Sequence, residues 1–186
     1  MGAGVIPFSV HDKNIYFLFQ TVFSGRKTGY LIDFGGGLGA GENYQEAAVR
    51  EFVEETETMY FSNDLQLAKR SIESVNAQIP IVKALFDKTL VEHPDYYCKR
   101  ATVNQLKPKD WQSFFIKFPY RDITDLNYVW KNDQTGRFKK RRELVWIGAD
   151  KLLTIYASEP DRLWKRVRQL ENARDVILAI QKDFML

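Results

Sequence analysis

Short runs of apolar residues dominate the first third of the chain, and they predict strands rather than helices. Residues 4–10 and 15–22 form the two longer runs, and the four polar residues 11–14 between them predict a hairpin connection. Residues 30–34 predict a third, shorter strand. The glycine-dense stretch that follows, residues 35–41, is expected to be a loop that leads into a helix.

Helical spacing begins near residue 43. Asn43 can cap a helix over residues 43–56, and Glu46 three residues later completes an approximate capping box. Residues 64–92 again repeat apolar side chains at helical spacing. Pro80 is expected to interrupt that run, so the segment predicts one broken helix or two.

The second half of the chain predicts three more strands and a closing helix. The strands are expected over residues 96–103, 111–120 and 143–147, with a polar loop over residues 133–142 before the last of them. From Ser158 onward, apolar residues recur every three or four positions, which is the stripe of one helix packed on a core. No repeat or linker divides the 186 residues, so we expect one domain.

Composition and charge narrow the class of protein without fixing an activity. Hydrophobic residues make up 45% of the chain and charged residues 27%, as in ordinary soluble globular proteins. The net charge of +3 permits an anionic substrate but falls short of a nucleic-acid-binding footprint. Cys98 is the only cysteine, which excludes a disulfide within the chain and favours a reducing, cytoplasmic location. No secretion signal and no run of about 18 apolar residues occurs.

The helix expected over residues 43–56 places three carboxylates on one face. Successive helical residues are about 100° apart, so Glu51, Glu54 and Glu55 lie together, with roughly 5–6 Å between Cβ atoms. Like charges at this spacing repel, and a divalent cation with oxygen ligands, magnesium in particular, would offset the repulsion. A solvated acidic face is the plainer alternative, and it is the commoner meaning of such a charge run.

The residues around this acidic face favour the metal. Seven residues follow one another at the intervals of a known motif, namely Gly36, Glu42, Arg50, Glu51, Phe52, Glu54 and Glu55. This pattern resembles the Nudix box. Two of the nine specified positions differ, because Glu57 stands where glycine is usual and Thr58 where an apolar residue is usual. The box covers residues 36–58, about an eighth of the chain, and its length and mixed residue types make it a specific signal.

The resemblance implies both a fold and a chemistry. The fold would be an α/β/α sandwich in which a mixed sheet lies between the box helix and the terminal helix. Residues 64–92 would then be a helical insertion, suited to a lid, a substrate cap or a homodimer surface. The activity would be magnesium-dependent hydrolysis, with manganese as the alternative cation, of a diphosphate linkage in a small nucleotide-like substrate. A catalytically silent domain that binds a nucleotide and regulates a partner is the alternative function.

The resemblance also assigns roles within the box. Glu51 and Glu55 are expected to bind the metal, with Glu54 beside them and the carbonyl of Gly36 as a further contact. Arg50 is expected to orient these carboxylates and to belong with them to the catalytic set, and Glu42 is expected to support the loop. Because all four charged residues at 50, 51, 54 and 55 are present, we favour catalysis over the silent domain.

The general base is expected either within the box or in a later loop. Glu143, which follows the polar loop and precedes a strand, is the candidate outside the box. The alternative for this residue is a surface glutamate paired with Arg141 or Arg142. Asp122 and Asp125 are weaker candidates for the base.

Other features of the sequence have plainer explanations. The basic residues 139–142 could attract phosphates or RNA, but such a cluster more often keeps a loop soluble, so nucleic acid is not the expected partner. His11 and His93, with a single cysteine, are too few for a zinc site. Tyr30, Phe34 and Trp130 could stack on a base, although most aromatic residues in a domain of this size build the core.

Overall fold

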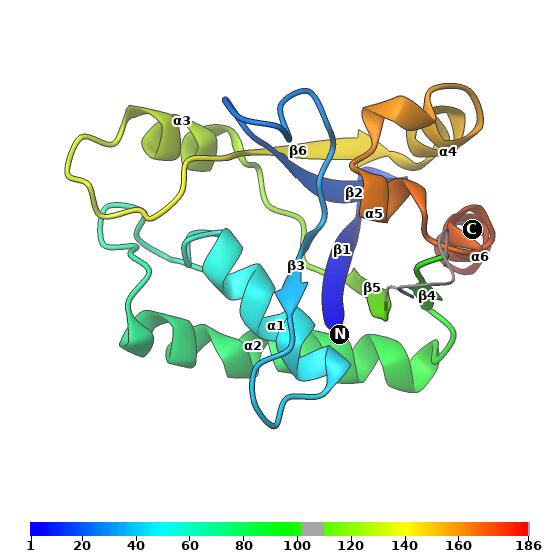
Figure 1. The fold of residues 1–186 in the computed structure, drawn as a ribbon, viewed down its shortest axis with the longest axis horizontal. Coiled ribbons are helices and arrows are strands. Elements are labelled where there is room, and N and C mark those ends of the chain that lie inside the picture. Colours follow the sequence, from blue (N-terminus) through cyan, green and yellow to red (C-terminus); the bar gives the residue numbers. More distant parts are fainter. Residues whose placement is uncertain (102–109, 186) are drawn as a thin grey trace.

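The computed structural model describes residues 1–101 and 110–185. One sheet is covered by helices on both faces (Figure 1). In chain order the elements are β1 (Gly2–His11), β2 (Asn14–Thr21), β3 (Phe34–Gly37), α1 (Tyr44–Glu55), α2 (Ile72–Glu92), β4 (Tyr97–Lys99), β5 (Trp111–Lys117), α3 (Thr124–Asn132), β6 (Glu143–Gly148), α4 (Ala149–Ser158), the 3-10 turn η1 (Pro160–Arg162), α5 (Lys165–Arg168) and α6 (Ala173–Phe184).

The long strand β1 organises the sheet, whose order is β4-β5-β1-β2-β6 with β3 paired to β1. The first half of β1 pairs with β3 and its second half pairs with β2, both antiparallel. Strand β5 lies parallel to β1, with Gly2 opposite Trp111, so the sheet is mixed as expected. The tight connection between β1 and β2 has positive φ angles at Asp12 and Lys13, which is the geometry of a two-residue hairpin turn.

Alternate side chains of the strands enter two separate cores, one on each face of the sheet. Ala3 and Val5 of β1 pack with α1 and α2, whereas Ile6 and Phe8 pack with α4, α5 and α6. The predicted α/β fold, with helices on both sides of a mixed sheet, is therefore confirmed (Figure 1). None of the helices in the described part of the chain has the length and apolar character that crossing a bilayer requires.

The helical segment before residue 92 differs from its prediction. Helix α2 is continuous over 21 residues and contains Pro80 without ending there, so the expected break is wrong. Its start is also later than predicted, because Ser71 caps it and residues 64–71 are irregular. The carbonyls of Leu65, Gln66 and Ala68 accept hydrogen bonds from the Arg137 guanidinium, which satisfies them without helical pairing.

Two further predictions need correction, and two helices had no prediction. The third strand begins at Phe34 and consists largely of glycines, whereas residues 31 and 32 form only isolated bridges. Gly35 explains this pairing, because a Cβ there would lie 2.5 Å from the carbonyl oxygen of Ala3 on β1. The single terminal helix is wrong, since η1, α5 and α6 are separate and Asn172 has a left-handed backbone between the last two. Helices α3 and α4 were not predicted.

The strand expected over residues 96–103 is found only as β4, and residues 102 and 103 lie outside the described part of the chain. The strands expected near residues 111 and 143 are confirmed as β5 and β6. The polar loop over residues 133–142 contains no helix or strand, also as predicted.

The start of α1 gives a first test. Asn43 Oδ1 accepts the Glu46 N–H at 2.8 Å, and Glu46 Oε2 accepts the Asn43 N–H at 3.0 Å, so the predicted capping box is present. Asn43→Ala removes the first bond and should lower the free energy of unfolding by about 1 kcal/mol, measured by urea denaturation. Gln45→Ala, at an exposed position in the same turn, is the control and should be neutral or slightly stabilising. Equal stabilities for both variants would contradict a capping role.

Candidate active site

The acidic face of α1 is partly buried rather than solvated. Its apolar side is anchored by Phe52, which packs edge-on against Phe34 and Phe118 with ring centroids 4.9 and 4.8 Å away. This packing fixes the rotation of the helix, so its carboxylates meet the glycine strand β3. The side chains of Glu51 and Glu54 are only 16% and 24% exposed.

Arg50 joins the box residues into one network. Its Nε and Nη2 donate to the two oxygens of Glu42 at 2.6 and 3.0 Å, and Nη1 lies 3.0 Å from Glu51 Oε1 and 3.4 Å from Glu54 Oε2. Nη2 also donates to the Gly37 carbonyl at 3.1 Å. The hydrogen bond from Arg50 lowers the pKa of the Glu42 carboxyl. Arg50 and Glu42 are therefore joined to each other, and Arg50 also contacts the two carboxylates of the helix face.

Arg70, which sequence reasoning missed, holds Glu54 from the other side. Its Nη2 lies 3.0 Å from Glu54 Oε2, and its Nη1 lies 3.9 Å from Glu57 Oε1. Glu57 is fully buried, and its Oε1 accepts the Lys140 N–H at 2.8 Å. Desolvation raises the pKa of Glu57. No motif or spacing marks Arg70, because its segment is irregular and joins α1 only in the folded chain.

Glu55 points into the protein and is separated from Glu51 and Glu54 by its bonding. Its residue is 6% exposed, and its carboxylate accepts the Gly35 N–H at 2.6 Å and Gln20 Nε2 at 3.1 Å. Burial raises the pKa of Glu55, with an opposing effect from the nearby Arg166. This carboxylate is thus fixed between the glycine strand and β2.

A buried ion pair supports the same glycine strand. Arg166 Nε lies 2.5 Å from Asp33 Oδ1, and the Asp33 side chain is 0% exposed. The same guanidinium lies 3.3 Å from the Gly35 carbonyl and 4.5 Å above the ring of Trp111. Within the described residues, Asp33 Oδ2 has no hydrogen-bond partner. Asp33 interrupts an apolar run in the sequence, and that buried charge was the one available signal for this pair.

Gly36 contacts the acidic helix directly. A Cβ at this position would lie 2.4 Å from Glu51 Oε1, so any larger residue here would require that carboxylate to move. The structure thus brings Gly36, Glu42, Arg50, Glu51 and Glu54 to one place. Across residues 1–101 and 110–185, however, no three acidic, histidine or cysteine side chains are already arranged as a cation site.

The candidates outside the box lie in different places. Glu143 is exposed at the start of β6, and within the described residues it forms no ion pair with Arg141 or Arg142. The next residue, Leu144, is paired with Gln20, which contacts Glu55, so Glu143 lies at the margin of the site. Asp122 accepts the Thr124 N–H at the start of α3, and Asp125 follows in the first turn of that helix.

The aromatic candidates for base stacking differ in their burial. Phe34 and Trp130 are 0% exposed and belong to the core. Tyr30 is half-buried and lies edge-on to Trp164, whose ring centroid is 5.5 Å away. Trp164 belongs to the apolar stripe that follows Ser158, but it is also only half-buried.

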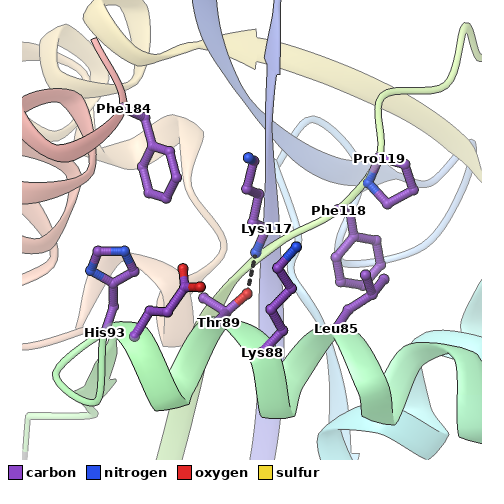
Figure 2. Close-up of a pocket in the computed structure, with 9 residues that line it drawn as sticks. Leu85, Lys88, Thr89, His93, Lys117, Phe118, Pro119 and Phe184 are labelled. Carbon is purple, nitrogen blue, oxygen red and sulfur yellow. Dashed lines mark hydrogen bonds between the residues drawn. The ribbon is translucent and has the colours of Figure 1, made fainter. Parts of the chain in front are cut away.

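Two cavities can be compared with this site. One of about 520 Å³ lies between α1 and α2 and reaches Glu42 and Arg50. The other, of about 460 Å³, is lined by Lys88, Lys117 and Phe184 among others (Figure 2). This second cavity lies at the opposite end of β5 from Trp111. None of the predicted site residues lines it, so it is separate from the residues of the box.

Comparison with known sequences gives one distant relative. No family model matches the chain. An uncharacterized protein of Acanthamoeba polyphaga mimivirus is 36% identical over 110 residues, which are 56% of this chain and 34% of that protein. The match therefore spans about a third of the relative's length.

Solved structures give likenesses over nearly the whole chain. The Ap4A hydrolase of C. elegans, in a binary complex, is 13% identical with a TM-score of 0.48, covering 98% of this chain and 97% of that one. The Nudix hydrolase RenU of M. smegmatis gives 14%, a TM-score of 0.46 and coverage of 96% and 86%. The NUDIX domain of Shewanella oneidensis NrtR, complexed with ADP ribose, gives 10%, 0.42, and 94% and 85%. These scores are too low to decide a function, which rests on the residues of the chain itself.

The buried carboxyl of Glu55 predicts a pH dependence of stability without metal. Because its pKa in the folded protein is raised, the unfolded chain ionises first as the pH rises above the ordinary value of 4.5. The folded state is then progressively disfavoured until Glu55 itself ionises. The free energy of unfolding of the wild type, minus that of Glu55→Gln, should therefore fall from pH 4.5 to neutral pH in EDTA. A difference that rises with pH would mean that Arg166 outweighs burial.

The backbone at the end of α1 gives a second test. Glu57 has a φ of 52°, a left-handed conformation that favours glycine. Glu57→Gly and Glu57→Ala both remove the carboxylate, so their comparison isolates the backbone. The glycine variant should be more stable by about 1 kcal/mol in urea denaturation. At Gln45, inside α1, the same pair should show the opposite order, and a matching order at both positions would refute the assignment.

Proposed function

We propose that the chain is a Nudix-type hydrolase that cleaves a diphosphate linkage in a nucleotide-like substrate with the help of a divalent cation. One observation carries the proposal. Residues that lie far apart in the box meet around Arg50, while Gly36 adjoins Glu51 so closely that a Cβ at residue 36 would displace the Glu51 carboxylate. A solvated acidic face would need neither the arginine network nor the glycine.

The donor set suits magnesium, with manganese as the alternative. Glu51 and Glu54 would supply carboxylate oxygens and Gly36 a carbonyl, which are the ligands of a hard cation. Glu55 would join them only by exchanging its hydrogen bonds from Gly35 or Gln20 for the metal. The 2.4 Å approach that a Cβ at Gly36 would make to Glu51 shows how closely that backbone and carboxylate adjoin. Glu51 and Glu54 are held by Arg50 in the structure described, so binding a cation requires them to exchange part of that contact for metal ligation.

The chain's own residues then have distinct tasks. Arg50 and Arg70 fix the Oε2 side of Glu54, and Glu54 Oε1 has no hydrogen bond within the described residues. We assign to that oxygen the proton from an attacking water, and Glu143 is the second candidate for the same task. The bound cation would neutralise the diphosphate and lower the pKa of its water. The products would be a monophosphate and a second phosphorylated fragment.

A nucleotide-binding domain without turnover is the second candidate. The observation that favours it is that both surface carboxylates are already paired with arginines, and no cation-ready cluster exists among the described residues. Under this alternative, Arg50 and Arg70 would be permanent partners of Glu51 and Glu54.

A substrate panel with magnesium or with EDTA tests the proposal. The wild type should release monophosphate from at least one nucleoside diphosphate derivative only with the cation present. Glu51→Gln and Glu54→Gln should each lose about 100-fold in kcat/KM, because each removes a charged group from the metal site. Glu171→Gln makes the same chemical change at an exposed position and should leave turnover unchanged.

A third variant, Glu143→Gln, tests which residue is the general base. If Glu143 takes the proton, Glu143→Gln should lower kcat without changing the metal concentration needed for half activity. Full turnover by Glu51→Gln and Glu54→Gln would defeat the site assignment. Tight binding of a nucleotide with no turnover of any compound would favour the silent domain.

A further inference from the structure

Three cationic side chains gather beside Glu55 on elements outside the box. Lys27 comes from the loop between β2 and β3, Arg142 from the segment before β6, and Arg166 from α5. Arg166 is paired with Asp33, but Arg142 Nη1 is buried and has no hydrogen-bond partner within the described residues. Burial together with the charges of Arg166 and Arg142 lowers the pKa of Lys27.

The sheet explains why these segments converge. Gln20 of β2 is bonded to Ile32 on one side and paired with Leu144 on the other, while its side chain donates to Glu55. The loop that carries Lys27 and the segment that carries Arg142 therefore both leave the sheet beside the buried carboxylate. Arg142 differs from residues 139–141, which are exposed, because it is half-buried and its Nη1 is enclosed next to the strand that pairs with Gln20.

Trp164 adds an aromatic surface beside these cationic side chains. A bridge between Leu31 and Leu163 holds its segment against the start of the glycine strand. Its half-buried indole has three cations around it, and the edge of Tyr30 lies 5.5 Å away. The ring centroid is 5.8 Å from Arg26 Cζ, 5.2 Å from Lys27 Nζ and 5.6 Å from Lys165 Nζ.

This combination of groups points to one kind of ligand. Like charges gathered around an indole repel one another unless an anion joins them, and Arg142 Nη1 has an unused donor. An accessible aromatic ring provides a stacking surface for a base, because every base has a π-face. A compound with an aromatic base at one end and phosphates beside it satisfies both parts at once.

We propose that Trp164 and Tyr30 receive the nucleobase of the substrate and that Lys27 and Arg142 bind its diphosphate, which places the linkage beside the acidic face of α1. The proposal rests on the proposed hydrolase function and narrows its substrate class. Nucleoside diphosphates and their derivatives fit this site, whereas diphosphates without a base reach only the cationic half. Trp164 and Arg142 are accordingly positioning residues, and neither takes part in proton transfer.

Calorimetric titration with ADP and with inorganic pyrophosphate, both in EDTA, tests the assignment directly. Trp164→Ala should weaken ADP binding about 10-fold or more and leave pyrophosphate unchanged, because only ADP has a base to stack. Trp164→Phe keeps an aromatic ring and should recover most of the ADP affinity. Arg142→Met should weaken both ligands. Tyr128→Ala and Lys182→Met, at exposed positions on α3 and α6, are the matched controls and should bind both ligands normally.

Two results would overturn the proposal. One is a wild type that binds ADP no more tightly than pyrophosphate, and the other is an unchanged ADP affinity in a Trp164→Ala variant whose circular dichroism is native. Trp164→Phe controls for misfolding. If Trp164 had only a structural role, Trp164→Ala would weaken the binding of both ligands and Trp164→Phe would restore both, whereas a stacking role affects ADP alone.

The titrations also separate this proposal from the hydrolase function. They need neither metal nor turnover, so ADP binding that depends on Trp164 would support the nucleobase site even if the substrate panel showed no cleavage. If cleavage is found, Trp164→Ala should raise KM about 10-fold with little change in kcat. Cleavage of a nucleotide with KM unaffected by Trp164→Ala would refute the nucleobase site and leave the hydrolase intact.

Discussion

The peptide groups of Gly35 connect the two charged halves of the site. The N–H donates to Glu55 at 2.6 Å and the carbonyl lies 3.3 Å from Arg166, while the absence of a side chain lets the strand press against β1. A buried carboxylate and a buried guanidinium are costly to desolvate, and each is retained because this backbone and Asp33 supply its partners. The next residue, Gly36, then adjoins Glu51.

Charges of opposite sign are distributed unevenly around this strand. Glu51 and Glu54 lie on the α1 side, tied to Arg50 and Arg70, and a cation would compete with those arginines for the same oxygens. The opposite side contains an excess of positive charge around Glu55. Such a division suits a diphosphate, which needs a metal at one set of oxygens and basic side chains at another. It also explains how a chain with a net charge of only +3 can be strongly polar at one place.

The sequence predicted those parts of the fold and site that depend on local pattern. The β1–β2 hairpin, the capped box helix and the cluster around Arg50 follow from turn residues, capping and i to i+4 spacing. The role of β3 was missed because glycines usually indicate a loop, and their strand pairing depends on a close approach to β1. Pro80 did not break α2, since Val75 on one side of it and Val82 and Phe86 on the other are buried in the core, which offsets one missing hydrogen bond.

The remaining site residues could not be found by local pattern. Glu55 shares a helical face with Glu51 in projection, but its burial is decided by β2 and β3. Asp33 and Arg166 are 133 positions apart, and nothing in either segment identifies the other. Arg142 resembles its basic neighbours until the start of β6 directs it inward.

The parallel pairing of β1 with β5 has a consequence for the order of folding. Strands that are distant in sequence must close a long loop before they gain any hydrogen bonds, whereas the β1–β2 hairpin and the helices need only local contacts. The ring of Trp111 on β5 lies against Gly35, and Arg166 lies above that ring. The site can therefore form only after the C-terminal third of the polypeptide has been synthesised. A nascent chain emerging from the ribosome would therefore carry its complete acidic motif well before it could use it.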